Sequence, residues 1–123
     1  MYSIGIDAEK ISRLKKSAQS QSFMKRVFSP KELALFEKRS NPYPTMAGNW
    51  AAKEAFSKAL GTGVRGFSLC EVSILRNEPG APYIELSGRA LAIAKNKRLE
   101  FSVSITHTNE LAQAAVIAFR KGD

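Results

Sequence analysis

Residues 46–63 read MAGNWAAKEAFSKALGTG, and this stretch decides the fold because it predicts one long helix with a glycine stop. Alanine and leucine are strong helix formers, Thr45 can cap the start, and Gly61 suits the position just past the last turn. At about 100° per residue the apolar side chains cover most of the circumference, which predicts a helix buried on several sides. Glu54 and Lys58 stand four residues apart on one face. Two interpretations are open: an ordinary exposed ion pair, or a charged pair that faces a ligand.

The chain has 123 residues and is expected to form one domain, residues 1–123. An active site in so short a chain can require a neighbouring subunit. No apolar run is as long as a membrane span, and the N-terminus lacks the basic region and cleavage site of a signal peptide, which predicts a cytoplasmic protein. The single cysteine, Cys70, excludes an internal disulfide, and no cluster of Cys and His has metal-binding spacing. We therefore expect no soft-metal chemistry.

The net charge of +8 is concentrated in the first third of the chain. Between Glu9 and Arg39 basic residues outnumber acidic ones nine to three. Such a stretch either forms a plain solvated face or attracts a polyanion, which could be nucleic acid, an anionic membrane or an acidic protein.

The N-terminal segment predicts a strand that ends at Asp7. Tyr2, Ile4 and Ile6 alternate with small or polar residues, the period-two pattern of a strand with one apolar face. Asp7 has two open roles: it could cap a helix expected over residues 8–17, or it could bind a metal ion.

The other segments give helix signals first and strand signals later. Ser29, Pro30 and Glu32 combine a serine cap, a proline in the first turn and a glutamate that reaches back, which predicts a helix to about Arg39. We also expect a short helix or turn over 20–28, a helix over 88–96, and strands over 69–76, 82–86, 100–108 and 111–119, the first two joined as a hairpin by the turn 77–80. This order predicts an α+β fold with a mainly antiparallel sheet and a long central helix.

The residues that could perform chemistry are few. His107, the only histidine, stands between two threonines and is either a satisfied core histidine or an anion-binding or catalytic group. A serine hydrolase and a P-loop are excluded, because the chain lacks Gly-x-Ser-x-Gly and no Gly-Lys-Ser/Thr follows residues 61–63. Two carboxylates, a lysine, a Gly-Thr-Gly loop and a His-Thr pair remain. They have one coherent use, since Mg²⁺ is typically held by one or two carboxylates together with substrate phosphates. The glycine loop is otherwise a plain helix stop.

Several short motifs occur in order along nearly the whole chain. They are GID at 5–7 with Arg13 six residues on, RVFSPKE at 26–32, WAAKEAFSKALGTG at 50–63, GAP at 80–82 and SITHT at 104–108. Together they resemble the small bacterial holo-acyl-carrier-protein synthases, and the block at 50–63 is the most specific. The resemblance implies the phosphopantetheinyl transferase fold and activity: the phosphopantetheine arm of coenzyme A moves to a serine of an apo acyl carrier protein, with release of adenosine 3',5'-bisphosphate. It also implies a homotrimer with active sites between subunits.

The same resemblance assigns roles to individual residues. Asp7, Glu54 and Lys58 would be the catalytic set, with Mg²⁺ held by the two acids and the pyrophosphate contacted by the lysine. The coenzyme A site would also include Gly61, Thr62 and Gly63 along the coenzyme, His107 and Thr108 at its ribose phosphate, and Pro82 of the adjacent subunit beside its adenine.

The resemblance gives the basic stretch a partner, because acyl carrier proteins are strongly acidic. Candidates for docking are Arg13, Lys16, Lys25 and Arg26. Neither nucleic acid nor a membrane is expected as a partner. One position departs from the family pattern: Asn49 stands where members usually carry arginine, so coenzyme affinity is lower or another basic residue substitutes. Two alternatives remain, a basic nucleic-acid-binding module, which lacks interleaved basic and aromatic residues, and a non-catalytic scaffold of the same fold.

Overall fold

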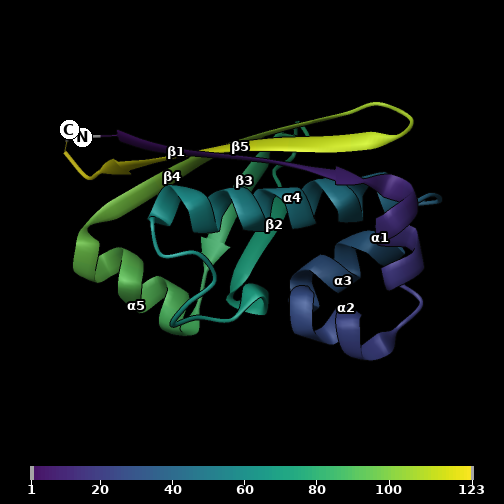
Figure 1. Ribbon diagram of the computed structural model, residues 1–123, viewed down its shortest axis with the longest axis horizontal. Helices are drawn as coiled ribbons and strands as arrows, with labels where there is room; N and C mark the ends of the chain where they lie inside the picture. Colours follow the sequence, from purple (N-terminus) through teal and green to yellow (C-terminus); the bar gives the residue numbers. More distant parts are fainter. Residues whose placement is uncertain (1, 123) are drawn as a thin grey trace.

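Residues 2–122 are described by a computed structural model, in which helices and strands surround one long helix (Figure 1). The elements in chain order are β1 (Tyr2–Lys10), α1 (Ile11–Ser17), α2 (Gln21–Val27), α3 (Pro30–Glu37), α4 (Tyr43–Leu60), a 3₁₀ turn η1 (Leu69–Glu71), β2 (Val72–Arg76), β3 (Pro82–Leu86), α5 (Gly88–Lys97), β4 (Leu99–His107) and β5 (Leu111–Arg120). Strands β1, β5 and β4 form one antiparallel sheet, and β2 pairs with β3 in a separate antiparallel hairpin. The predicted α+β fold, with a mainly antiparallel sheet and a long central helix, is confirmed.

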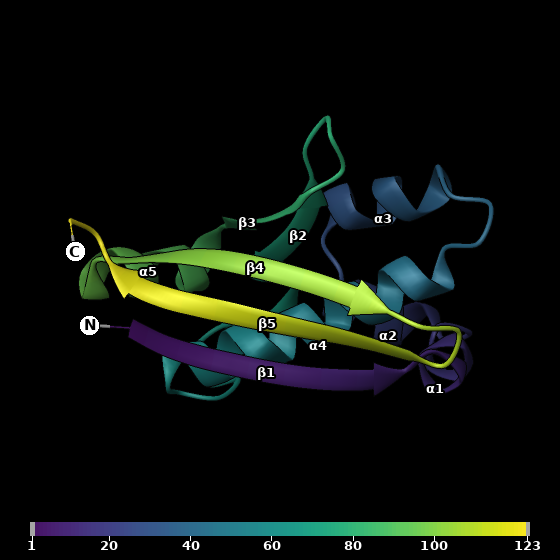
Figure 2. The same cartoon turned by 90° about the horizontal axis from the view of Figure 1, so that it is seen from above.

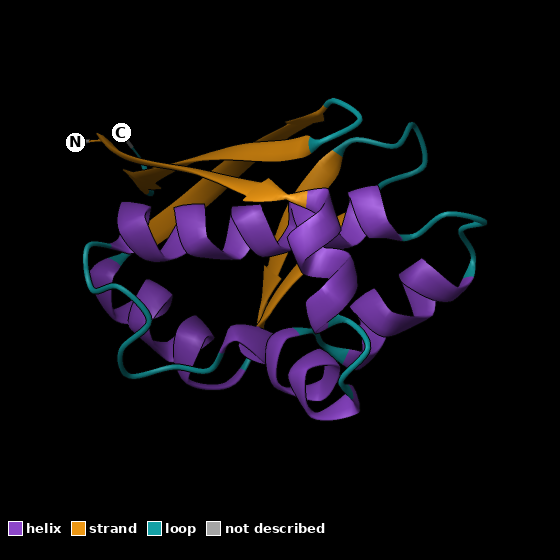
Figure 3. Cartoon of the chain, turned by 45° about the vertical axis from the view of Figure 1, so that its right-hand side comes forward, coloured by secondary structure: helices purple, strands orange, loops and turns teal. Residues whose placement is uncertain are grey.

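Helix α4 lies along one face of the three-stranded sheet, with the other helices on its opposite side (Figure 1, Figure 3). Strand and helix meet closely at Gly5, where a Cβ atom would lie 1.9 Å from the carbonyl oxygen of Ala55. Ala51 and Ala55 are fully buried. Small residues on both elements therefore set the distance between β1 and α4. Within residues 2–122 no helix combines the length and the hydropathy that crossing a membrane requires.

Apolar side chains bury α4 on several sides, as predicted. One cluster joins the second half of the helix to the hairpin and the sheet through Phe56, Val72, Ile74 and Val116. The other joins its first half to α1, α2 and α3 through Leu14, Phe23, Phe28 and Phe36. The helix thus connects two halves of the core, and residues along its length are fixed relative to both.

Some boundaries differ from the sequence-based prediction. Helix α4 begins at Tyr43, its N-cap position is Pro42, and Thr45 lies inside the helix and does not cap it. Strand β1 continues past Asp7 to Lys10 because each residue pairs with β5, so Asp7 lies within the strand and is not a helix cap. Residues 69–71 form η1 rather than strand, since the side chain of Glu71 turns back and accepts from the backbone N–H of Ser68. Local cap and strand signals were outweighed by pairing and turn geometry.

The apolar face of β1 points away from α4. Tyr2, Ile4 and Ile6 are 71%, 60% and 59% exposed. Ile117 of β5, opposite Ile4 in the register, extends the same outer face, which Figure 2 shows from above. Contiguous exposed apolar side chains of this kind mark an interaction surface.

Candidate active site

Asp7 and Lys58 meet where the middle of β1 crosses α4. Lys58 Nζ donates to the carbonyl oxygen of Ile6 at 2.9 Å and lies 3.4 Å from Asp7 Oδ1. The lysine side chain is 57% exposed and the aspartate 18%. No ion pair joins Glu54 to Lys58 among residues 2–122, so the interpretation as an ordinary pair along the helix is wrong. The lysine instead places its charge beside Asp7, which with Glu9 and Glu54 forms an acidic cluster.

Asp7 has an oxygen that lacks a donor. Its Oδ2 atom is buried and has no hydrogen-bond partner among the described residues. A buried carboxylate oxygen without a partner is costly, and a hard cation such as Mg²⁺ satisfies it well. This orphaned oxygen is the feature of the site that fits a metal ion.

Glu9 adds a carboxyl group that sequence reasoning missed. It stands two residues after Asp7 on the same face of β1, as the strand period requires. Partial burial and the nearby carboxyl groups of Asp7 and Glu54 raise the pKa of Glu9 to about 7, while the charge of Arg13 acts in the opposite direction. Each of these causes follows from carboxyl groups gathered in a place with limited access to water. Side chains two residues apart on a strand lie on the same face, so the spacing from Asp7 could have identified Glu9 from the sequence.

Glu54 adds a carboxylate to this acidic cluster from α4, since its charge acts on Glu9. Its Oε1 accepts from Trp50 Nε1 at 3.3 Å, so the indole one turn earlier orients the carboxylate. Among residues 2–122 no three Asp, Glu, His or Cys side chains are arranged to hold a metal ion by themselves. One or two carboxylates suffice for Mg²⁺, because this ion keeps several waters and takes further oxygens from phosphates.

Residues 61–63 end α4 in the manner of a helix stop. Gly61 has φ 86° and occupies the C-cap, and Gly63 also has a positive φ, 63°. A Cβ atom at either glycine would meet nothing within 4 Å, so backbone conformation and not crowding requires glycine here. Thr62 Oγ1 donates to the carbonyl oxygen of Gly63 at 2.9 Å. The space beside both glycines is open, so a ligand could approach the backbone of this loop.

His107 and Thr108 lie at the turn between β4 and β5. His107 is exposed, so its interpretation as a core histidine is wrong. In the sheet register, Ala112 of β5 pairs with His107 of β4 on one side and with Glu9 of β1 on the other. Neighbouring strands are about 4.8 Å apart, so the backbones of His107 and Glu9 are about 10 Å apart. Thr108 Oγ1 accepts from the backbone N–H groups of Glu110 and Leu111 and shapes the turn.

Pro82 lies elsewhere in the topology. It opens β3 in the hairpin, which is not hydrogen-bonded to the sheet that carries Asp7.

Comparison with known proteins decides between the interpretations left open by the residues. Residues 3–116 match the family model described as the 4'-phosphopantetheinyl transferase superfamily. The chain belongs to this family. The prediction made from its motifs is confirmed, and with it the assignment to an enzyme class rather than to a nucleic-acid-binding module.

Relatives within the family agree over nearly their whole length. A holo-acyl-carrier-protein synthase of Caldanaerobacter subterraneus subsp. tengcongensis is 42% identical over 94% of this chain and 92% of its own. The crystal structure of such a synthase from Neisseria meningitidis has a TM-score of 0.89 at 29% identity, covering 96% of this chain and 98% of that one. The Helicobacter pylori synthase, solved in complex with coenzyme A, has a TM-score of 0.81 at 32% identity, covering 94% and 99%.

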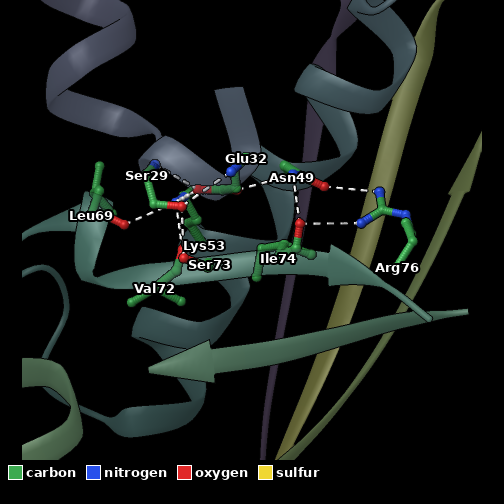
Figure 4. Close-up of polar contacts among 9 residues, drawn as sticks. All are labelled: Ser29, Glu32, Asn49, Lys53, Leu69, Val72, Ser73, Ile74 and Arg76. Atoms are coloured by element: carbon green, nitrogen blue, oxygen red, sulfur yellow. Dashed lines mark hydrogen bonds and ion pairs between the residues drawn. The ribbon is translucent and has the colours of Figure 1, made fainter. Parts of the chain in front are cut away.

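The position at which this chain departs from the usual family pattern is fully buried. Asn49 Nδ2 donates to Glu32 Oε2 and to the carbonyl oxygen of Ile74, both at 2.9 Å, and Asn49 Oδ1 accepts from Arg76 Nη2 at 2.8 Å (Figure 4). Position 49 therefore faces α3 and the hairpin. Residue 49 of this chain has no guanidinium group, but Arg76 places one beside it.

A buried ion pair stands in the same network, and sequence reasoning missed it. Lys53 Nζ donates to Glu32 Oε1 at 2.6 Å and to the carbonyl oxygens of Leu69 and Val72, and both charged side chains are 0% exposed (Figure 4). Burial lowers the pKa of Lys53, and the charge of Glu32 opposes that shift. Glu32 was identified only as a cap of α3, which it is: Ser29 N–H donates to its Oε1 at 3.0 Å. One carboxylate thus caps α3 and attaches it to α4.

The four docking candidates are all exposed on α1 and α2. Arg13 and Lys16 border a groove of about 590 Å³ that Lys10 and Lys15 also line. Lys25 and Arg26 lie in the last turn of α2. The structure thus leaves these cations, predicted from the sequence, available to an acidic partner.

Proposed function

We propose that this chain transfers the phosphopantetheine arm of coenzyme A to a serine of an apo acyl carrier protein and releases adenosine 3',5'-bisphosphate. The observation that carries this proposal, in a chain of this family, is the buried Oδ2 of Asp7 beside Lys58, which has no hydrogen-bond partner among residues 2–122. The names of its relatives and the coenzyme A bound to one of them support the choice of substrates.

Asp7 and Glu54 would hold Mg²⁺ in this proposal. A bound Mg²⁺ would supply positive charge that stabilises the leaving phosphate, and these two acids would keep it in place. Lys58 would contribute a second positive charge beside the same phosphate, because its Nζ already lies 3.4 Å from Asp7 Oδ1.

The coenzyme would extend from the acids toward the other predicted binding residues. Gly61, Thr62 and Gly63 leave open space beyond the end of α4. His107 and Thr108 present exposed polar groups at the β4–β5 turn and would hold the ribose phosphate.

Pro82 would reach the adenine from an adjacent subunit of a homotrimer. The exposed apolar face of β1 and β5, with Ile4, Ile6 and Ile117, supports such an assembly because it would bury these side chains. An acidic carrier protein would dock on Arg13, Lys16, Lys25 and Arg26, steered by charge.

The test is incubation with coenzyme A, Mg²⁺ and an apo carrier protein, followed by intact-mass measurement of the carrier. We expect the mass of phosphopantetheine to be added by the wild-type protein, and the rate to fall at least about 100-fold in Glu54→Gln because a metal ligand and its charge are lost. Glu37→Gln, which removes an exposed carboxylate on α3, is the matched control and should retain full activity. No added mass on any of several carriers would refute the proposal, and full activity of Glu54→Gln would exclude Glu54 as a ligand.

A further inference from the structure

A cavity of about 690 Å³ lies at the end of the molecule where β4 begins, and its lining includes neither Asp7 nor Glu54. Its lining comes from β3, α5, the start of β4 and the segment after β5. Strands β3 and β4 belong to different sheets, so their edges are not hydrogen-bonded to each other within residues 2–122. Figure 2 shows α5 near the end of the sheet where β4 starts. The volume is within the range of roughly 300–1,000 Å³ typical of small-molecule sites.

The floor of this cavity is apolar. Ile84 and Leu86 of β3 face it, with Leu91 of α5 and Leu99 and Phe101 of β4. All five side chains are only half-buried, so each has apolar surface that a ligand could cover. Aliphatic surface from three separate elements around one hollow suits a flexible hydrocarbon chain.

The rim of the cavity is cationic. Lys95, Arg98 and Lys121 are exposed around it, and Glu100 is the one acidic residue of the lining. None of these three cations takes part in an ion pair between residues 2–122. Lys121 N–H donates to the carbonyl oxygen of Arg98 at 2.8 Å, so the backbone places these two cationic residues side by side. Two neighbouring cationic residues can both reach one anionic head group.

Arg98 also has an unfavourable backbone conformation. Its φ of 56° and ψ of 42° place it in the left-handed region, and no other non-glycine residue between 2 and 122 has a positive φ. Glycine is the usual residue at such a helix end. Arginine at this position keeps a cation at the mouth of the cavity at the expense of backbone strain.

We propose that this cavity binds a single-chain anionic amphiphile of the fatty-carboxylate class, with its chain on the apolar floor and its head group against Arg98 and Lys121. Within one chain the cavity is far from His107: Leu99 at one end of β4 and His107 at the other are separated by eight residue steps, roughly 27 Å at 3.4 Å per residue. It is closer to Gly61, because Arg98 and Leu99 also line a neighbouring pocket with that glycine. We expect the ligand to bind beside coenzyme A and not in its place, and competition with coenzyme A tests this directly.

The experiment is isothermal titration calorimetry of the full chain with hexanoate, octanoate and decanoate, each below its critical micelle concentration, with and without saturating coenzyme A. Each buried methylene should tighten binding by up to roughly fourfold. Decanol and decyltrimethylammonium at the same concentrations test the head group and should bind at least 10-fold more weakly. No binding of decanoate, or its displacement by coenzyme A, would overturn the proposal.

Arg98→Gly separates binding from folding. It relieves the positive φ and should raise the melting temperature of the free protein, yet weaken decanoate binding by about 10-fold because the cation is lost. Lys121→Gln should weaken binding similarly, while Lys38→Gln, which removes an exposed cation after α3, should not change it. Wild-type affinity in both Arg98→Gly and Lys121→Gln, or equal binding of decanol, would show that the rim does not recognise an anion.

Discussion

The substitution Lys53→Met is the sharpest test of the buried polar network that joins Lys53, Glu32 and Asn49. The substitution removes a 2.6 Å ion pair from Glu32 and two hydrogen bonds from the carbonyl groups of Leu69 and Val72. Glu32 would keep only its bonds from Ser29 N–H and Asn49 Nδ2, while remaining fully buried. A buried charge that loses its partner destabilises a protein by about 3–5 kcal/mol. The total unfolding free energy of a domain is only about 5–15 kcal/mol, so the loss should be large.

The assay is urea unfolding followed by far-UV circular dichroism at fixed protein concentration, with thermal melts in parallel. We expect Lys53→Met to lower the melting temperature by roughly 10–20 °C. The double variant Glu32→Gln/Lys53→Met removes both charges, and the glutamine can still accept from Ser29 N–H and cap α3. It should recover about 2 kcal/mol relative to Lys53→Met, and this comparison remains measurable if the single variant folds poorly.

The exposed pair Lys31–Glu85 is the matched control. It has the same 2.6 Å separation, but its side chains are 65% and 44% exposed. Lys31→Met should therefore change stability by less than about 1 kcal/mol. If Lys53→Met has an equally small effect, or if the double variant is simply additive, the argument that burial makes this pair indispensable is wrong.

The remaining predictions concern Glu9 in the acidic cluster, Arg13 among the docking candidates and Ile4 on the exposed face of the sheet. Because the pKa of Glu9 is raised to about 7 from 4.5, the folded state binds more protons than the unfolded state between those values, so stability should fall as pH rises from 5 to 8. Glu9 is partly exposed, so screening limits this loss to about 1 kcal/mol, and urea unfolding of Glu9→Gln should lack that loss. Arg13→Glu should raise KM for the carrier protein about 10-fold and leave KM for coenzyme A unchanged in steady-state assays; equal effects on both would exclude a docking role. Ile4→Glu should reduce the mass measured by light scattering from that of the proposed homotrimer to that of a monomer, while an unchanged assembly would place the interface elsewhere.

Local features of the fold were predictable because they depend on neighbours in sequence. The capping box of Ser29 and Glu32 forms as expected, and Gly61 ends α4 in the left-handed conformation. The hairpin of β2 and β3 also follows from its turn residues. Each of these features depends on hydrogen bonds or backbone angles within a few residues, and it agrees with the tertiary packing.

The arrangement of the acidic site was predictable only in part. The motifs identified Asp7, Glu54 and Lys58, but the helix pattern offered Glu54 as the partner of Lys58, whereas the structure pairs Lys58 with Asp7. That contact joins residues 51 positions apart, and it depends on the close approach of β1 to α4 at Gly5. Spacing along one helix carries no information about which strand will lie beside it.

The sequence by itself determined the family, the long central helix, the alternation of β1 and the positions of the candidate charges. Tertiary structure alone decided that the apolar face of β1 points outward, that Asn49 and Lys53 are buried with Glu32, and that Asp7 keeps an oxygen without a donor. The physical reason is that helix formation and strand alternation are set by short-range sterics and hydrogen bonds. The environment of a charged side chain is set by the register and packing of segments that meet only once the chain has folded.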